Sequence, residues 1–367
     1  MRDRKLLRRV RSFAVLVAGA LALVACSDGG NDNGQNSLNP NGPAAKQIDD
    51  LFIPVLILAI VIGVAVLTAT VVLALRFRAR PGRNENPKQI HGSTPLEIGW
   101  TIVPALILLV VAVPTVATIW DLAERPKGPD VLEVNVVGKQ WWWEFELPKQ
   151  AMVDRKVVTS TELHIPVNTK VVLTQTSDNV IHSFWVPELA GKKDVVPGHR
   201  NTNVIEADKP GVYLGACAEY CGLAHADMRF RVVAQPMDEW RAWLADQQEG
   251  PAQPFEGEVK ELVEQRFQCT NCHIFDDSTK TNYGPNLTHL ASRSTFAGGV
   301  YEVDRQNLVD WVLDAPSMVP MEAKDCRLPP PATCVGMPSF TKNTPKGMPT
   351  MTKEEAETIV DYLLKEK

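Results

Sequence analysis

The sequence predicts a multidomain membrane protein, in which a hairpin of two transmembrane helices precedes two extramembrane domains. Residues 51–75 and 101–120 are uncharged apolar runs, each long enough for the roughly 20 residues that cross a bilayer core. Residues 128–245 carry short alternating or β-branched segments separated by turn residues, which is typical of an all-β sandwich. A Gln-, Gly- and Pro-containing linker, residues 246–256, leads to a separate unit, residues 257–367, with its own cysteine motif.

Length, charge balance and cysteine count limit the classes of function that the chain can have. The 367 residues allow two or three domains, and 38 basic against 43 acidic residues give no sign of a nucleic-acid partner. The seven cysteines are an odd number, which indicates separate chemistries rather than one disulfide framework. Cys26 stands alone, and the close pairs are Cys217 with Cys221, Cys269 with Cys272, and Cys326 with Cys334.

The N-terminus has the layout of a secretory signal. Residues 1–25 place a basic segment before an apolar run rich in small residues. The run ends in Leu-Val-Ala-Cys26, which resembles the bacterial lipoprotein box, so we expect a signal peptide of lipoprotein type and lipidation of Cys26; the alternative is an incidental cysteine. Residues 26–48 are rich in Gly, Asn and Asp, and we expect them to form a flexible tether.

The transmembrane hairpin is expected over residues 49–122. Two uncharged runs in succession argue against the alternative, which is a buried core helix. The loop between them is basic, and the positive-inside rule therefore places it in the cytoplasm. We expect a multi-pass protein of the bacterial inner membrane, with both later domains on the outer side. The basic residues are Arg76, Arg78, Arg80, Arg83 and Lys88.

The first extramembrane unit is expected to be a β-sandwich. Its clearest strand patterns are residues 131–137, 161–164, 170–176 and 229–233. Between the last two patterns lie Gly215-Ala-Cys-Ala-Glu-Tyr-Cys-Gly222 and the residues that follow it. Residues 217, 221 and 225 are four apart and could share one helical face, but the glycines and the strand-like flanks favour a metal-holding loop between strands.

Metal-ligating side chains are concentrated in this loop. Cys217, Cys221, His225 and Met228 follow one another at short spacing, and His182 lies upstream. A disulfide would leave the histidines and the methionine unexplained, and zinc would be satisfied by two cysteines and two histidines. The thioether of Met228 favours copper. Two cysteines at this separation can also bridge two metal ions, which allows a dinuclear centre.

The Cys-x3-Cys-x3-His-x2-Met loop, with an upstream His and a preceding two-helix hairpin, resembles subunit II of haem-copper cytochrome c oxidases over residues 45–245. The resemblance implies a cupredoxin-like sandwich holding dinuclear copper A. It also implies contact with subunit I, and a magnesium site at that interface through the Glu219 side chain. Quinol-oxidase relatives lack the copper ligands. The implied ligands are Cys217 and Cys221 as bridges, His182 and His225 as terminal ligands, Met228 on one copper, and the Glu219 carbonyl on the other.

Three consecutive tryptophans follow Gln140. Alternate strand residues face opposite sides of a sheet, so at least one of the three should lie at a surface or an interface. The family resemblance implies that Trp141 is the residue through which electrons enter. A packed sandwich residue or a membrane-interface anchor is the alternative. Asp194 and His199 lie in a segment that resembles one that meets subunit I, so we expect interface residues there rather than ligands.

The last unit contains Cys269-Thr-Asn-Cys272-His273, the c-type haem attachment motif: two thiols reach the vinyl groups, and the histidine supplies an axial nitrogen. A thioredoxin-like or zinc site would not need His273. The unit resembles an all-α class I cytochrome c with covalently attached haem c. On that resemblance residues 258–267 form the leading helix, the Pro285 carbonyl orients His273, and a capping box of Thr352 and Glu355 opens the terminal helix.

The sixth haem ligand is expected to be Met337, because Met337-Pro-Ser-Phe matches the family's Met-Pro-x-Phe. Met348 shares only the Met-Pro and is the alternative. Cys326 and Cys334 are not part of the usual motif. Outside the cytoplasm we expect them to form a disulfide that closes a short loop ahead of Met337.

Together these features predict the electron-entry subunit of a caa3-type oxidase. Electrons would pass from an upstream cytochrome c or bc complex to the haem, then to copper A, and on to subunit I, where oxygen is reduced to water with proton translocation. One alternative is the copper A subunit of a nitric oxide reductase. Another, of a different class, is a membrane-tethered copper chaperone or sensor.

Overall fold

The computed structural model describes residues 34–78, 91–276, 283–321, 335–342, 344 and 347–365. The signal peptide, Cys26, most of the basic loop, and the Cys326 and Cys334 pair lie outside these residues. The predictions made for them therefore stay predictions.

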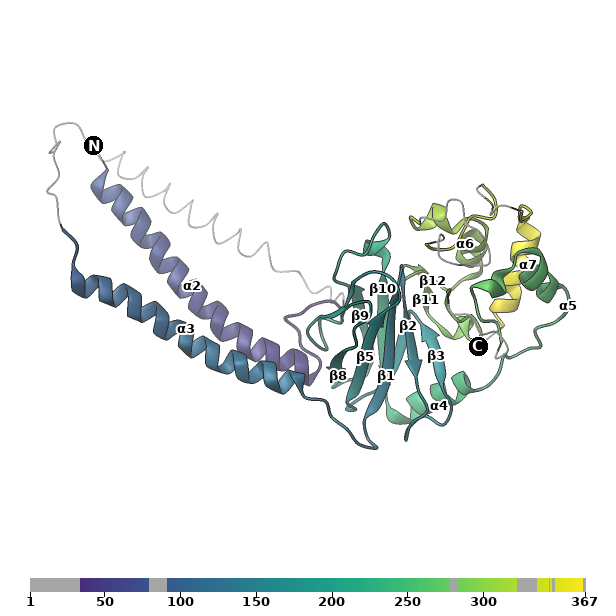
Figure 1. Cartoon of the computed structure of the whole chain (residues 1–367), viewed down its shortest axis with the longest axis horizontal. Coiled ribbons are helices and arrows are strands. Elements are labelled where there is room, and N and C mark those ends of the chain that lie inside the picture. The colour runs from purple at the N-terminus through teal and green to yellow at the C-terminus, as the bar shows by residue number, and fades with distance from the viewer. Residues whose placement is uncertain are drawn as a thin grey trace, which may run out of the picture. The chain divides into compact units, whose positions relative to one another are not determined.

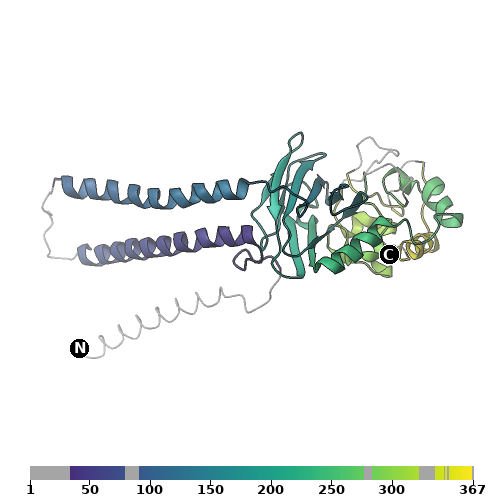
Figure 2. The ribbon, with the colours of Figure 1, turned by 90° about the horizontal axis from the view of Figure 1, so that it is seen from below.

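Two long apolar helices come first. Helix α2 spans Pro43–Phe77 and helix α3 spans Thr94–Ala123, and they run side by side (Figures 1 and 2). Both are long and apolar enough to cross a membrane. Large apolar side chains such as Leu67 and Val110 are exposed along them, at 68% and 72%. A lipid or protein environment must cover such a surface, which agrees with the transmembrane hairpin predicted from the sequence.

The segment before α2 differs from the expected tether. Helix α2 begins at Pro43 rather than at residue 49. The Asn41 backbone N–H donates to the Glu188 carbonyl at 2.8 Å, and the Asn41 carbonyl accepts from the Asp208 N–H at 2.9 Å. The Asn41 side chain also donates to the Glu188 carboxylate at 2.8 Å. These hydrogen bonds offset the entropy cost of ordering the segment. Its few apolar residues could not offset that cost by burial.

The middle unit is a sandwich of two five-stranded sheets, ordered β3-β2-β1-β5-β8 and β4-β10-β9-β6-β7. Strands β1 and β5 pair in parallel, as do β4 and β10, and the other pairs are antiparallel. All four strand patterns read from the sequence are confirmed. The strands are β1 Leu132–Lys139, β2 Trp142–Leu147, β3 Val157–Ser160, β4 Glu162–Pro166, β5 Val171–Ser177, β6 His182–Trp185, β7 Lys193–Val195, β8 Asn201–Ile205, β9 Gly211–Cys217 and β10 Arg229–Gln235.

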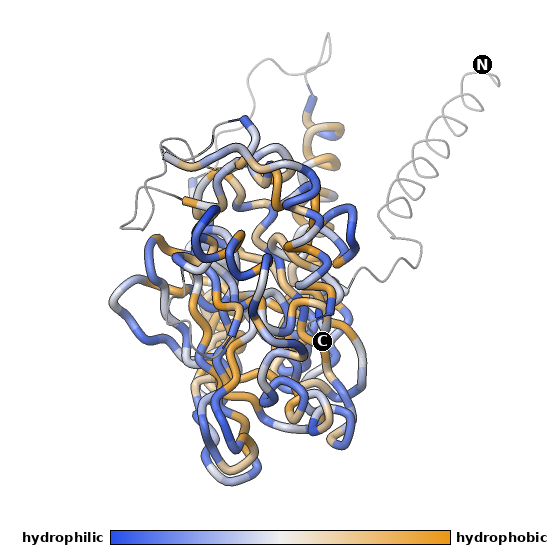
Figure 3. Tube along the Cα trace, turned by 90° about the vertical axis from the view of Figure 1, so that its right-hand side faces the viewer, coloured by the Kyte–Doolittle hydropathy of each residue, from blue (hydrophilic) through white to orange (hydrophobic). Residues whose placement is uncertain are grey.

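Aromatic rings fill the space between the sheets. Trp143 and Phe145 from one sheet pack against Phe184 and Phe230 from the other, with ring centroids 5.4 to 6.4 Å apart, and all four are fully buried. Gly215 lies against this cluster, and a Cβ there would sit 2.1 Å from the Phe230 ring. Hydrophobic and hydrophilic residues are interspersed along the chain trace (Figure 3), and buried residues alternate with more exposed ones along β10, as alternating side-chain direction requires.

Helix α4, Met237–Gln248, covers one end of the sandwich. Trp240 is its fully buried anchor, and the indole N–H donates to the His164 carbonyl at 3.1 Å. The helix runs past residue 245, so the connection to the last unit is shorter than the linker expected from composition.

The last unit is mainly helical and has its own core. A leading helix is present near residues 258–267 as expected, but its second half is a π-helical turn. The capping box of Thr352 and Glu355 is confirmed, with bonds of 2.9 and 3.2 Å. A two-stranded sheet departs from the all-α expectation. The elements are α5 Gly257–Lys260, η2 Glu261–Arg266, η3 Cys269–Asn271, η4 Leu290–Ser292, β11 Thr295–Phe296, β12 Tyr301–Glu302, α6 Arg305–Met318 and α7 Lys353–Leu363.

Replacing Trp240 by Ala should lower the free energy of unfolding of the sandwich by about 3–5 kcal/mol, because it leaves a large cavity and an unpaired carbonyl. The measurement is chemical unfolding of the detergent-solubilised chain followed by tryptophan fluorescence. Arg241→Ala, at an exposed position of the same helix, is the control and should change little. Equal stability of the two variants would contradict the anchoring role of Trp240.

Candidate metal centre and adjoining cavity

The loop rich in metal ligands joins two strands of the second sheet. Cys217 is the last residue of β9, Cys221 lies in the turn that follows, and His225 opens the short helix η1, His225–Asp227. Met228 immediately precedes β10. A loop between strands, rather than one helical face, therefore presents these side chains, as the glycines indicated.

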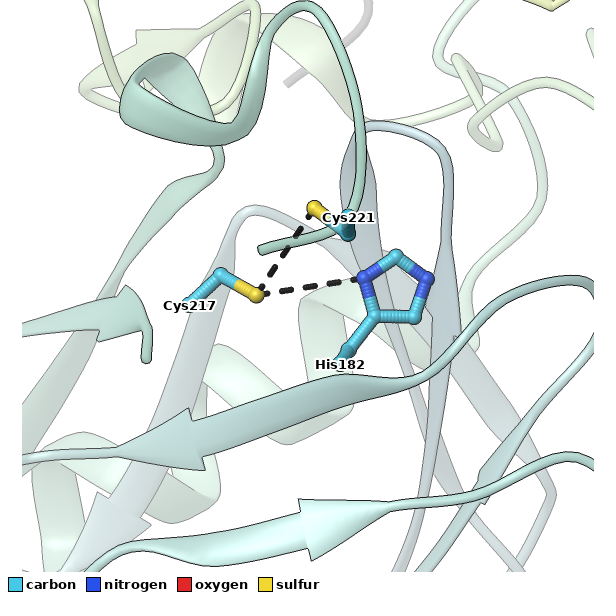
Figure 4. A group of neighbouring side chains, drawn as sticks. All are labelled: His182, Cys217 and Cys221. Atoms are coloured by element: carbon cyan, nitrogen blue, oxygen red, sulfur yellow. Dashed lines mark hydrogen bonds between the residues drawn. The ribbon is translucent and has the colours of Figure 1, made fainter. Parts of the chain in front are cut away.

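The six donors predicted from the sequence converge. The Cys217 sulfur contacts both the Cys221 sulfur and His182 Nδ1 (Figure 4), at 3.9 Å each. The Cys221 sulfur lies 3.6 Å from His225 Nδ1 and 3.7 Å from Met228 Sδ. The Glu219 carbonyl is 3.2 Å from the Cys217 sulfur. His182 and Met228 are fully buried, and both cysteines are buried.

The electrostatics of this cluster favour a cation. Cys217 and Cys221 are not joined in a disulfide. Contact with Cys221 lowers the pKa of Cys217 to about 4, with His182 adding to the effect, and contact with Cys217 raises the pKa of Cys221. One thiol thus ionises readily while the second resists, because two buried thiolates side by side repel. A metal ion bound by both sulfurs would supply the charge needed to hold both in the thiolate form.

Asn179 and Gly138, which the sequence analysis did not single out, fix the position of His182. Its Nε2 meets the Asn179 side-chain oxygen at 3.2 Å, so Nε2 carries the proton and Nδ1 presents its lone pair toward the sulfurs. Gly138 lies against the ring, since a Cβ there would be 2.8 Å from His182 Cδ2. Asn179 stands only three residues before His182, and that short spacing is the one signal that could have found it.

The three tryptophans have different positions. Trp143 is in the core, Trp142 is half-buried with the Lys139 ammonium 4.9 Å from its ring centroid, and Trp141 is 8% exposed. The Trp141 indole N–H donates to the Cys221 carbonyl at 3.1 Å, and the Gln140 amide donates to the same carbonyl at 2.7 Å. Trp141 is therefore a packed residue that also touches the metal-ligand loop directly.

A cavity of about 520 Å³, within the range of small-molecule sites, lies beside this loop. Trp141 and Trp142 of the sandwich line it, together with Cys269, Cys272 and His273 of the last unit. His273 Nδ1 lies 2.9 Å from the Pro285 carbonyl and must donate to it, which leaves Nε2 as the nitrogen with a free lone pair. This is the contact that the sequence pattern predicted.

Burial keeps the reactive groups of the cavity neutral. It raises the pKa of Cys269 to about 12 and raises that of Cys272, and it lowers the pKa of His273 despite the bond to Pro285. Two neutral thiols and one neutral imidazole in an otherwise largely apolar cavity suit a flat, apolar macrocycle with a metal at its centre.

Met321, Met337 and Met351 line the cavity, and Met348 packs on the hydrophobic core of the last unit. The Met337 backbone N–H donates to the Met321 sulfur at 3.1 Å, and Gly336 leaves room for it. Met321 and Met351 are two further thioethers at the cavity that the motif did not single out, and the choice of Met337 over Met348 stays a prediction.

The remaining candidates lie at the surface. The Glu219 side chain is exposed and accepts from the Tyr220 N–H at 3.1 Å, and Asp194 and His199 are exposed. None of them belongs to the sulfur and imidazole cluster, which agrees with interface residues rather than ligands.

Comparison with known proteins identifies the family. Residues 132–235 match the model for "Cytochrome C oxidase subunit II, periplasmic domain", and residues 33–118 match the corresponding transmembrane domain. Cytochrome c oxidase subunit 2 of Alkalihalophilus pseudofirmus is 32% identical over 366 residues, 98% of each chain. The chain belongs to the cytochrome c oxidase subunit II family. It is thus a subunit of a haem-copper terminal oxidase, an oxidoreductase, and its periplasmic domain is of the kind that binds copper A.

Other members of the subunit II family match over less of the chain. Quinol oxidase subunit 2 of Bacillus cereus is 33% identical over 240 residues, 64% of this chain and 80% of its own length. The crystal structure of the periplasmic domain of subunit II from Bradyrhizobium japonicum is 28% identical, with a TM-score of 0.30, and covers 33% of this chain and 94% of that domain.

Asn179→Leu should weaken copper binding roughly 10- to 100-fold while leaving the fold intact, because His182 loses the partner that fixes its ring. Titration of the metal-free chain against a competing copper chelator measures this. Asn135→Leu, in the other sheet, is the matched control and should bind copper like the unmodified chain. An unchanged affinity in Asn179→Leu would remove Asn179 from the site.

Proposed function

We propose that this chain holds dinuclear copper A in the buried sulfur and imidazole cluster. The observation that carries the proposal is the convergence of two free cysteines, two histidines, one thioether and one carbonyl within contacts of 3.2 to 3.9 Å. Thiolates and a thioether select copper over harder metals. In this assignment Cys217 and Cys221 bridge, His182 and His225 are terminal ligands, Met228 binds one copper, and the Glu219 carbonyl binds the other.

The cavity of the last unit is the site of covalently attached haem c in this proposal. Cys269 and Cys272 form the thioether links, His273 is one axial ligand, and Met337 is the other. The neutral thiols, the Pro285 contact of His273 and the position of Met337 in the cavity wall support it. When bound, the two cofactors supply one-electron redox chemistry.

The chain is then the electron-entry subunit of a caa3-type oxidase. It takes electrons from an upstream cytochrome c or bc complex at the haem domain and delivers them from copper A to subunit I, where oxygen is reduced with proton translocation. Trp141 is the entry residue, since it contacts the Cys221 carbonyl and lines the cavity. The near full-length match to a cytochrome c oxidase subunit 2, against 64% coverage by a quinol oxidase subunit, supports this form of oxidase.

The proposed function also includes the anchoring and orientation of the chain in the membrane. The two apolar helices anchor a multi-pass subunit in the bacterial inner membrane, both later domains face the outer side, and Cys26 is lipidated after signal removal. The exposed Glu219 side chain faces subunit I and a magnesium site there. The nitric oxide reductase alternative differs only in the partner subunit. The copper chaperone alternative is not favoured by the family match.

Replacing Cys217 or Cys221 by Ser should abolish the delocalised mixed-valence copper signal in electron paramagnetic resonance, because each thiolate bridges both metal ions. Met228→Leu is the matched control. It should keep two coppers per chain and shift only the redox potential, since an axial thioether tunes the centre. A delocalised spectrum that survives in either serine variant would refute the dinuclear assignment.

Replacing Met337 by His should convert His/Met haem ligation to bis-His, remove the absorption band of a ferric iron–sulfur bond and lower the haem potential, while haem stays attached through Cys269 and Cys272. Absorption spectroscopy and redox titration measure these changes. Met348→His is the control and should leave the spectrum unchanged. The opposite pair of phenotypes would assign the ligand to Met348, and loss of the band in Met321→Leu alone would assign it to Met321.

A further inference from the structure

A buried carboxylate joins the sandwich to the last unit. Glu162, the first residue of β4, is 2% exposed. Its Oε1 accepts from the backbone N–H groups of Ser294 and Thr295 at 3.0 Å each, from the Thr295 hydroxyl at 3.2 Å, and from the Ser294 hydroxyl. All four donors belong to the unit that carries the haem motif. One carboxylate of the sandwich therefore accepts the hydrogen bonds of a turn in the last unit.

Charged groups beside Glu162 strengthen this contact. The buried Arg293 guanidinium donates to the Ser160 hydroxyl at 2.8 Å and to the Asn286 carbonyl at 2.6 Å, and Arg231 donates to the Ser294 hydroxyl at 2.8 Å. Burial alone would raise the pKa of Glu162, but hydrogen bonds from His164 and Ser294 outweigh it and lower the pKa. Glu162 is therefore ionised at neutral pH, and Ser294 of the other unit contributes to this beside His164 of the sandwich.

The same turn rests on the copper-ligand loop. The Gly298 carbonyl accepts from the Arg229 N–H at 2.9 Å, directly after Met228. A Cβ on Gly298 would lie 2.0 Å from the Asp227 carbonyl, and its φ of +70° also favours glycine. Arg293 and Gly298 line the haem cavity together with Trp141. Residues 293–299, the docking segment, thus touch the copper loop and the haem cavity at once.

We propose that Glu162 is a positioning residue that docks the C-terminal unit on the sandwich through the docking segment. Electrons then pass from haem to copper across a permanent contact between the two units. This inference rests on the proposed function. A linker alone gives only a raised effective concentration, and each transfer would then wait for an encounter. A buried carboxylate with four donors from the other unit holds the separation of the two sites constant instead.

The first test needs no cofactor activity. In the copper-free full-length chain, hydrogen exchange followed by mass spectrometry should find the Ser294 and Thr295 amides protected. Glu162→Gln removes the charge that both amides face and should speed their exchange by roughly tenfold or more, with helices α6 and α7 unchanged. Glu146→Gln is the matched control, because the Glu146 carboxylate bonds to Asn135 and Lys156, which both lie in the sandwich.

The second test measures electron transfer in the loaded oxidase. After rapid photoreduction of the haem, the rate of copper reduction should be independent of solvent viscosity in the unmodified chain and in Glu146→Gln. In Glu162→Gln the rate should fall by roughly tenfold or more and decrease further with added glycerol, while the haem and copper spectra stay unchanged. A merely structural role would not create a viscosity dependence at unchanged spectra.

Unchanged amide protection in Glu162→Gln, or transfer that stays fast and independent of viscosity, would overturn the docking role. If Glu162→Gln also loosens α6 and α7, Thr295→Val decides instead, because it removes a single donor and should show the same local change on a smaller scale. A chain that binds no haem or no copper would refute the proposed function, and the exchange test would still decide on docking.

Discussion

The structure depends on holding two sulfurs 3.9 Å apart in a buried site. Neighbouring thiolates repel, and burial makes the repulsion worse, so the fold must both force the approach and leave room for a cation. The β9 and β10 hairpin fixes the two ends of the ligand loop, and β6 brings His182 to it from the same sheet. The aromatic core between the sheets makes that geometry rigid, since Trp143 packs edge-on against both Phe184 and the His182 ring.

The same rigidity extends to the second site. The Cys221 carbonyl accepts from both Gln140 and Trp141, and Trp141 also forms part of the cavity that holds Cys269 and His273. The metal-ligand loop and this cavity therefore share Trp141, whose indole is placed by the loop itself. A change in the loop would move a residue of the cavity as well as the candidate metal ligands.

Polar groups buried between segments recur where composition suggested flexible connections. Asn41 bonds to Glu188 and Asp208 ahead of α2, and Glu162 bonds to Ser294 and Thr295 between the two extramembrane units. In each case a carboxylate accepts hydrogen bonds across a large sequence separation, from the Asn41 side-chain amide at Glu188 and from two backbone N–H groups at Glu162. Apolar content alone predicts that such segments are flexible, because it carries no information about hydrogen bonds between residues that are distant in sequence.

The sequence by itself determined the two apolar helices, the alternating strands, the capping box and the set of candidate metal-ligating side chains, because each of these depends on local spacing or on residue type. Only the tertiary structure decided that Asn179 contacts His182, that Met321 lines the cavity beside Cys269 and His273, that the first two of the three tryptophans border that cavity, and that Glu162 bonds to the last unit. These depend on which strands become neighbours and on how side chains fill the space between them, and pairing of that kind leaves no periodic signal in a single chain.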